Sequence, residues 1–447
     1  MTATPANLRS APEDESPPFA PYASDQPPFS DYDYIQEEWI ATGDERGRPY
    51  ATTVLVRRPR DFDSFSGTVI VEPLHAHGIT PIWIYTAPYI LRSGHAWVEV
   101  ASQKTALDMH VKGSQPERYR TLHIEGPDTS TFDPNPRLGD SEASEKFWSD
   151  LESRNGASST ILAQVGAALK ETEGPFAGKA TQLILAGHSQ TGSVTTYYIR
   201  DAHDAQRLAD GSPIFDGFFP TGYPEEAFHA VDVPIVQVMS DGDIALPDFA
   251  FRPGRSGRRY RREDSDNPGD RYRLYELAGV PHMGTRVPPY DDRSLWEAQM
   301  ASEPDVILGP KMNSLPHFEL FSMCLHHLVE WVAHGIVPPR AERLEVGPDG
   351  YFVKDEHGNT VGGVRCVQLD VPHSTYLPNP LNRDGTPSYL TVGNEMPFDI
   401  PKLQALYGSA NNYISRFDRR LADLIDEGWL LSDDAASMQS EALQVTF

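Results

Sequence analysis

Short apolar runs bounded by glycine, proline or polar residues recur along the chain and predict buried strands. Runs of this length and setting are typical of strands that are covered on both faces. Such strands belong to parallel sheets with helices packed on each side. The runs lie at residues 67–73, 96–102, 181–187, 214–220, 234–240 and 271–279.

Helical patterns alternate with these strands. Residues 81–92 form an apolar stretch between the first two runs, and they predict a crossover helix. Ile161, Val165 and Leu169 repeat every fourth residue, and apolar residues three or four positions apart over 321–332 predict another amphipathic helix. Residues 33–42 and 49–57 alternate around a glycine-rich turn and predict an antiparallel pair at the sheet edge. The sequence therefore predicts an α/β fold with a mostly parallel central sheet flanked by helices.

One turn in this pattern carries candidate chemistry. Ser189 follows the strand at 181–187 and precedes a helical stretch, with Gly187 and Gly192 on either side. Strand, sharp turn with serine and helix together make the nucleophile elbow of the α/β-hydrolases. The second glycine stands at 192, whereas the common G-x-S-x-G spacing puts it where Thr191 lies.

Two further polar residues follow later strands in the order that a hydrolase triad needs. Asp243 comes after the strand at 234–240, and His282 comes after the strand at 271–279. The order serine, acid, histidine is that of α/β-hydrolases, and each residue lies beyond a strand end, where open parallel sheets place their sites. We expect Asp243 to be the acid. Asp241 remains an alternative, and either residue could simply form the turn beside Gly242.

The chain resembles a bacterial-type family of α/β-hydrolase domain proteins whose elbow reads G-x-S-Q-[ST]-G. The resemblance runs from about Tyr34 to near the C-terminus, and implies an α/β-hydrolase fold with serine-hydrolase chemistry. This chain departs from the family at residues 73–77, Pro-Leu-His-Ala-His, where a Trp-Leu-Asn-like segment is expected. Besides the elbow, the passages that carry the resemblance are residues 65–74, 95–103, 275–282 and 358–365.

These residues define an expected site. His282 would act as the general base for Ser189, with Asp243 orienting its ring. The oxyanion would be held by the backbone N–H of Gln190 and by one from the loop around His75. We expect His77, Trp83 and Tyr85 to line the substrate pocket, although aromatic residues at this spacing are also typical of plain core.

Neither a metal nor a cofactor is expected. His75 and His77 have a spacing that could suit a metal ion, but no third ligand of matching spacing follows. A hydrolase with a complete triad also needs no metal. The two cysteines, Cys324 and Cys366, cannot build a disulfide framework.

The charge composition limits which classes of partner the protein is expected to bind. The formal net charge of −26 argues against nucleic-acid binding and against adsorption to anionic lipid. Residues 252–273 are rich in arginine, and we interpret them as a solvated excursion with local Arg–Asp pairs; a loop that recognises carboxylates is the alternative. The N-terminal residues show no leader pattern and no apolar run has the length of a membrane span, so we expect a cytoplasmic protein.

The chain divides into three expected parts. Residues 1–30 predict a flexible N-terminal segment, and 31–340 a hydrolase core with insertions at about 104–156 and 245–270. Residues 341–447 predict a C-terminal extension with a hairpin and helices, which could cover the site or form a homo-oligomer surface.

The expected function is hydrolysis of a small carboxylic ester or lactone through an acyl-enzyme on Ser189. An amidase or acyltransferase would use the same triad and differ only in its pocket. A non-catalytic binding module on a hydrolase fold is the alternative from another class.

Overall fold

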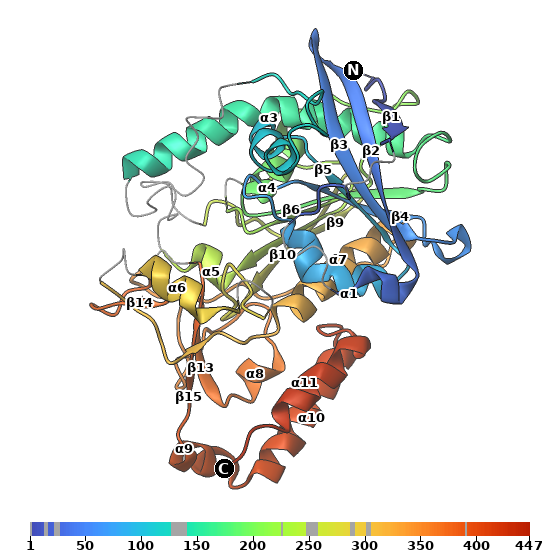
Figure 1. Cartoon of the computed structure of the whole chain (residues 1–447). Helices are drawn as coiled ribbons and strands as arrows, with labels where there is room; N and C mark the ends of the chain where they lie inside the picture. The colour runs from blue at the N-terminus through green and yellow to red at the C-terminus, as the bar shows by residue number, and fades with distance from the viewer. Residues whose placement is uncertain are drawn as a thin grey trace.

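The computed structural model describes residues 2–12, 17–21, 27–126, 141–224, 227–246, 258–286, 291–300, 305–388 and 391–447. Its centre is a 10-stranded sheet in the order β1-β2-β3-β5-β4-β6-β7-β8-β10-β9 (Figure 1). The strands are β1 (Asn7–Ser10), β2 (Tyr34–Glu45), β3 (Arg48–Pro59), β4 (Thr68–Pro73), β5 (Ala96–Val100), β6 (Gln182–His188), β7 (Gly217–Thr221), β8 (Ile235–Ser240), β9 (Ser265–Asn267) and β10 (Asp270–Leu277).

The middle of the sheet is parallel, as the apolar runs predict. Strands β5, β4, β6, β7, β8 and β10 pair in parallel, whereas β1, β2 and β3 form an antiparallel margin and β9 pairs antiparallel with β10. The residues of β4, β5, β7 and β8 are buried along their whole length. Their carboxyl ends lie along one edge of the sheet, where the loops after β6, β8 and β10 meet.

Helices cover both faces of the sheet. On one face, α1 (Pro81–Arg92) and α7 (His317–His334) pack against each other and against β5 to β8. On the other face lie α3 (Ser141–Leu169) and α4 (Gln190–Tyr197), which continues as a wider π-helical turn, Tyr198–Ala202 (Figure 1). The predicted α/β class and flanked parallel sheet are confirmed.

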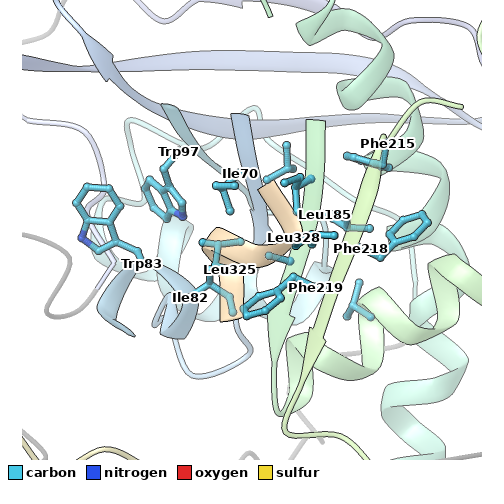
Figure 2. Packing of buried hydrophobic residues seen from close by; sticks show 14 of the residues in the cluster. Ile70, Ile82, Trp83, Trp97, Leu185, Phe215, Phe218, Phe219, Leu325 and Leu328 are labelled. Atoms are coloured by element: carbon cyan, nitrogen blue, oxygen red, sulfur yellow. The ribbon is translucent and has the colours of Figure 1, made fainter. Parts of the chain in front are cut away.

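The core lies between the sheet and these helices. Ile70 of β4 and Leu185 of β6 face Leu325 and Leu328 of α7, and Phe218 belongs to the same cluster (Figure 2). All of these side chains are fully buried. The core therefore fixes the sheet against α1 and α7, and the sheet in turn positions the loops at its carboxyl edge.

The N-terminal residues contribute an ordered element that their composition does not predict. Residues 7–10 form β1, which pairs with β2 in the register Ser10↔Trp39 and so covers the edge of the predicted hairpin. Residues 13–16 and 22–26 of the expected flexible segment lie outside the described residues. Residues 127–140 and 247–257 of the two expected insertions also lie outside them.

The C-terminal part builds a second, smaller cluster of buried apolar residues. Helices α9 (Ile400–Tyr407), α10 (Ala410–Asp426) and α11 (Ala435–Ala442) supply most of it, and they lie at one end of the molecule (Figure 1). Residues 344–362 make isolated antiparallel bridges in two successive turns. The short elements between α4 and α9 are α5 (Asp241–Ile244), α6 (Arg293–Met300), α8 (Val367–Asp370) and strands β11 (Val306–Ile307), β12 (Lys311–Met312), β13 (Ser374–Leu377), β14 (Leu381–Asn382) and β15 (Asn394–Pro397).

Several contacts join this C-terminal cluster to the hydrolase core, among them one hydrogen bond and one ion pair. His327 on α7 and the carbonyl of Gly428 are 2.9 Å apart, and the guanidinium of Arg92 on α1 pairs with Asp434 at 2.7 Å. Among the described helices, none combines the length and the apolar character that a membrane crossing requires.

Candidate active site

The turn between β6 and α4 holds Ser189 in a strained backbone conformation. Ser189 has φ 59° and ψ −119°, a region that non-glycine residues rarely occupy. Its N–H donates to the carbonyl of Thr221 on the neighbouring strand, at 3.0 Å, and its carbonyl accepts from Ser193. Strand and helix together therefore hold this turn, and strain of this kind is typical of functional sites.

Glycines on either side of Ser189 allow the close approach of strand and helix. A Cβ on Gly192 would lie 2.3 Å from the carbonyl oxygen of Thr221. A Cβ on Gly187 would lie 2.2 Å from the carbonyl oxygen of Thr191. Thr191, which stands where the common motif has its second glycine, has a role of its own in this turn. Its hydroxyl accepts from the N–H of His188 at 3.0 Å.

Ser189, His282 and Asp243 form one chain of hydrogen bonds. The Oγ of Ser189 lies 3.0 Å from Nε2 of His282, although the two residues are 93 positions apart in the sequence. Nδ1 of His282 hydrogen-bonds to Oδ1 of Asp243. The three residues thus have the contacts that a serine nucleophile, a general base and an orienting acid require.

The carboxylate of Asp243 is held in its ionised form. Burial alone would raise the pKa of Asp243. The neighbouring charge of His282 and its hydrogen bond lower that pKa by more, so the net shift is downward. The backbone N–H of Ser240 also donates to Oδ2 of Asp243, at 2.7 Å. The acid is therefore a fixed anion beside the imidazole.

Asp241 points to different partners. Its Oδ2 accepts from the N–H of Gly279 at 3.0 Å and from the hydroxyl of Thr360. Asp241 thus ties the loop after β8 to β10 and to the C-terminal turns, and the structure brings His282 to Asp243 instead.

The backbone N–H of Gln190 is a free donor next to Ser189. Gln190 is the first residue of α4, so its N–H precedes the helical hydrogen-bond pattern. Within the described part of the chain, nothing accepts a hydrogen bond from this N–H. This is the arrangement expected of one oxyanion donor.

The expected second donor, a backbone N–H of residues 74–76, is not free in the structure. The N–H of His75 itself closes a turn of the loop by donating to a carbonyl, which corrects the expectation that it faces an oxyanion. The acceptors of these three N–H groups are the carbonyl of Val100 at 2.9 Å, the carbonyl of Ile79 at 3.1 Å and Oε1 of Gln190 at 3.1 Å.

Two glutamine side chains hold this loop against the elbow. Nε2 of Gln190 donates to Oε1 of Gln103 at 2.6 Å, and Nε2 of Gln103 donates to the carbonyl of Leu74 at 3.1 Å. Both side chains are buried. Neither contact could be read from the sequence, because Gln103 follows β5 and is 87 positions from Gln190.

The three residues expected in the pocket have different surroundings. Tyr85 packs edge-on against His188, with ring centroids 5.3 Å apart, and so lies beside the site. His77 stacks on His75 at 4.9 Å. Trp83 instead lies in the core, 5.0 Å from Trp97, so its place corrects the pocket expectation (Figure 2). Both rings are buried, but Trp83 packs against Trp97 of β5 and Tyr85 packs against His188.

His188 is a site residue that sequence reasoning missed. Its ring stacks on that of His282, with centroids 4.6 Å apart and planes at 26°. Its Nε2 lies 3.1 Å from the carbonyl oxygen of His282, and its Nδ1 lies 2.9 Å from the hydroxyl of Thr221. The G-H-S sequence was a visible signal, but the contact with His282 depends on the fold.

The arginine-rich segment forms local ion pairs where it is described. Arg262 pairs with Asp270 at 2.7 Å, and Arg261 pairs with the fully buried Glu276 at 2.7 Å. Arg252 and Arg255 lie outside the described residues. In the described part of the chain, no group of three or more His, Cys, Asp or Glu side chains is arranged to hold a metal ion.

One family model matches most of the chain. Residues 29–440 match the model of the family described as alpha/beta hydrolase domain, and the chain belongs to this family. Comparison with curated proteins finds no significant match.

The matches among solved structures include a depolymerase and several esterases. The LpqC poly(3-hydroxybutyrate) depolymerase of Bordetella parapertussis has 13% identity and a TM-score of 0.33, over 68% of this chain and 91% of that one. An acetyl xylan esterase from Paenibacillus sp. R4 has 11% identity and a TM-score of 0.32, over 67% and 89%. Est1E of Butyrivibrio proteoclasticus has 12% identity and a TM-score of 0.29, over 59% and 96%.

Proposed function

We propose that this protein is a serine hydrolase that cleaves small carboxylic esters or lactones. The observation that carries the proposal is the hydrogen-bonded chain from Ser189 through His282 to the ionised Asp243. Its serine stands in a strained turn at the end of a parallel strand, which exposes the hydroxyl to a substrate. Membership of the α/β hydrolase family supports the same class of reaction.

The proposed reaction gives each of these residues a defined role. Nε2 of His282 takes the hydroxyl proton as Ser189 Oγ attacks the acyl carbon, and His282 then gives the proton to the departing alkoxide. Asp243 stabilises the imidazolium formed in between. A water molecule, deprotonated by His282, attacks the acyl-enzyme and releases the acid and Ser189.

The backbone N–H of Gln190 supports the oxyanion in both steps. It lies at the start of α4, where the helix dipole also favours negative charge. A single donor of this kind contributes about 3 kcal/mol in comparable sites. Amide hydrolysis and acyl transfer would use the same residues, so the substrate preference must be measured.

The test is turnover by the purified full chain of p-nitrophenyl esters, lactones and p-nitroanilides. We expect ester or lactone turnover that Ser189→Ala removes while thermal unfolding stays nearly unchanged. Ser374→Ala is the matched control, because Ser374 is also buried but its hydroxyl donates to Glu395 in the pair of strands β13 and β15. Equal activity in wild type and Ser189→Ala would contradict the proposal.

A further inference from the structure

The imidazole of His75 is held in one tautomer. The backbone N–H of His77 donates to Nδ1 of His75, at 3.0 Å. A ring nitrogen that accepts a hydrogen bond carries no proton, so the neutral ring must carry its proton on Nε2. His75 therefore presents an N–H donor whose position is fixed by the chain itself.

This donor has no partner of its own. His75 is 4% exposed, and none of the described residues accepts a hydrogen bond from its Nε2. Nε2 of His75 is nevertheless not completely enclosed by protein atoms, so a substrate oxygen can reach this donor.

The surroundings of His75 keep its ring neutral. Burial lowers the pKa of His75 far below its usual value, and the neighbouring histidines 77, 188, 282 and 110 lower it further. The ring stacks on His77 at 4.9 Å, which restrains its plane.

The loop that carries His75 is fixed to the nucleophile elbow. The next residue, Ala76, donates its N–H to the side chain of Gln190 at 3.1 Å. The carbonyl of Ala76 contacts Nε2 of His110 at 2.7 Å. His75 is thus one residue from a direct contact with the residue that follows Ser189.

We propose that the Nε2–H of His75 is the second oxyanion donor, together with the backbone N–H of Gln190. The backbone N–H groups of residues 74–76, which would ordinarily fill this role, already donate within the protein. A neutral imidazole can stabilise a developing oxyanion, because its N–H is oriented before the reaction begins. This inference rests on the proposed serine-hydrolase function.

The test compares two substitutions at one position. His75→Phe keeps a flat ring of similar size and removes the donor, whereas His75→Gln keeps an N–H near the position of Nε2. We expect His75→Phe to lower kcat for a p-nitrophenyl ester about 10²- to 10³-fold with KM changed less than about threefold. His75→Gln should recover at least a tenth of the wild-type kcat.

Two controls separate this role from a structural one. His203→Gln removes another buried histidine, whose ring nitrogen pairs with Asp232 at 2.7 Å away from the proposed triad, and it should keep the wild-type kcat. Thermal unfolding of each variant shows whether His75→Phe and His75→Gln are folded alike. If His75→Phe is unfolded, the kcat values of His75→Gln and a His75→Leu variant are compared instead, and they show whether a donor at this position is required.

The outcomes distinguish this inference from the proposed function. If Ser189→Ala abolishes turnover but the donor-free variants at position 75 retain the wild-type kcat, the second-donor role is wrong and the hydrolase proposal stands. Equal losses in His75→Gln and His75→Phe with equal losses of stability would likewise assign His75 a structural role. Absence of any serine-dependent turnover in the wild type would overturn both.

Discussion

His188 and His282 lie face to face, with ring centroids 4.6 Å apart and planes at 26°. Because a carbonyl oxygen can only accept, the Nε2 of His188 must donate to the carbonyl of His282. Its Nδ1 is then unprotonated and accepts from the hydroxyl of Thr221. Burial lowers the pKa of His188 well below its usual value, in agreement with this neutral tautomer. His188 therefore fixes both the backbone and the ring plane of His282.

We predict that His188→Leu lowers kcat by about tenfold or more, because the loop that carries His282 loses a hydrogen bond and a stacking partner. His188→Phe should fall between wild type and His188→Leu, since it keeps the stacked ring alone. The pH–rate profile of each variant checks the role: a change in the profile indicates altered positioning of His282. His203→Leu is the matched control, because His203 is also a buried histidine but its ring pairs with Asp232 at 2.7 Å. Unchanged kcat in all His188 variants would show that the contact is only structural.

The two aspartates after β8 should respond differently to conversion to asparagine. Asp243→Asn leaves the geometry in place but favours the wrong tautomer of His282, so we expect kcat to fall by roughly 10⁴-fold. Asp241→Asn should keep most of the activity, since an amide oxygen can still accept from the N–H of Gly279. Its effect should be a lower unfolding temperature. Similar, mild losses of kcat in both variants would mean that neither residue orients His282.

Gly192, like Gly187, should tolerate no side chain. An added Cβ would lie 2.3 Å from the carbonyl oxygen of Thr221, which is part of the sheet and cannot move without breaking β7. We expect Gly192→Ala to lower the unfolding temperature by several degrees and to reduce turnover. Gly269→Ala is the control, because nothing lies within 4 Å of the added atom. Equal unfolding temperatures for the two variants would contradict the close approach.

A buried carboxyl pair predicts how stability depends on pH. Burial raises the pKa of Glu72 and of Glu99 to about 8, and the charge of Glu72 also contributes to raising the pKa of Glu99. The unfolded chain loses these protons near pH 4.5, so between that pH and about 8 the folded state binds more protons. Stability from these groups is therefore complete below pH 4.5 and is lost as the pH rises through about 8.

We predict that Glu99→Gln weakens this loss of stability at high pH. Glu99 is the better choice because its Oε2 has no hydrogen-bond partner among the described residues, whereas Glu72 accepts from two N–H groups of α1 and from Trp97. The free energy of unfolding at pH 9 relative to pH 5 should improve by on the order of 1 kcal/mol or more. Chemical denaturation at both pH values measures it, with the exposed Glu173→Gln as control. An equal pH dependence in wild type and Glu99→Gln would contradict the raised pKa.

The parallel part of the fold could be predicted because each central strand is a short apolar run with clear ends. The helix at 81–92 was predicted with the bounds that α1 has in the structure. The placement of Ser189, Asp243 and His282 after strands also followed from the sequence order alone. In contrast, β1 could not be predicted, because its residues are polar and its order comes from pairing with β2.

The finer parts of the site depend on contacts between distant residues. The pairing of Gln103 with Gln190 and the stacking of His188 on His282 join loops that follow different strands. The loop after β4 is another part of the site that the sequence predicts incompletely. The sequence indicates where an oxyanion donor belongs but not which N–H is free. Only the hydrogen bonds of that loop reveal that the backbone N–H of His75 is occupied while its ring N–H is available.

The most direct test of the account is to react the full chain with a fluorophosphonate probe and locate the adduct by peptide mass spectrometry. The account predicts one adduct per molecule, on the peptide that contains Ser189, and none in Ser189→Ala. A wild-type protein that takes up no probe, or an adduct that persists in Ser189→Ala, would contradict it.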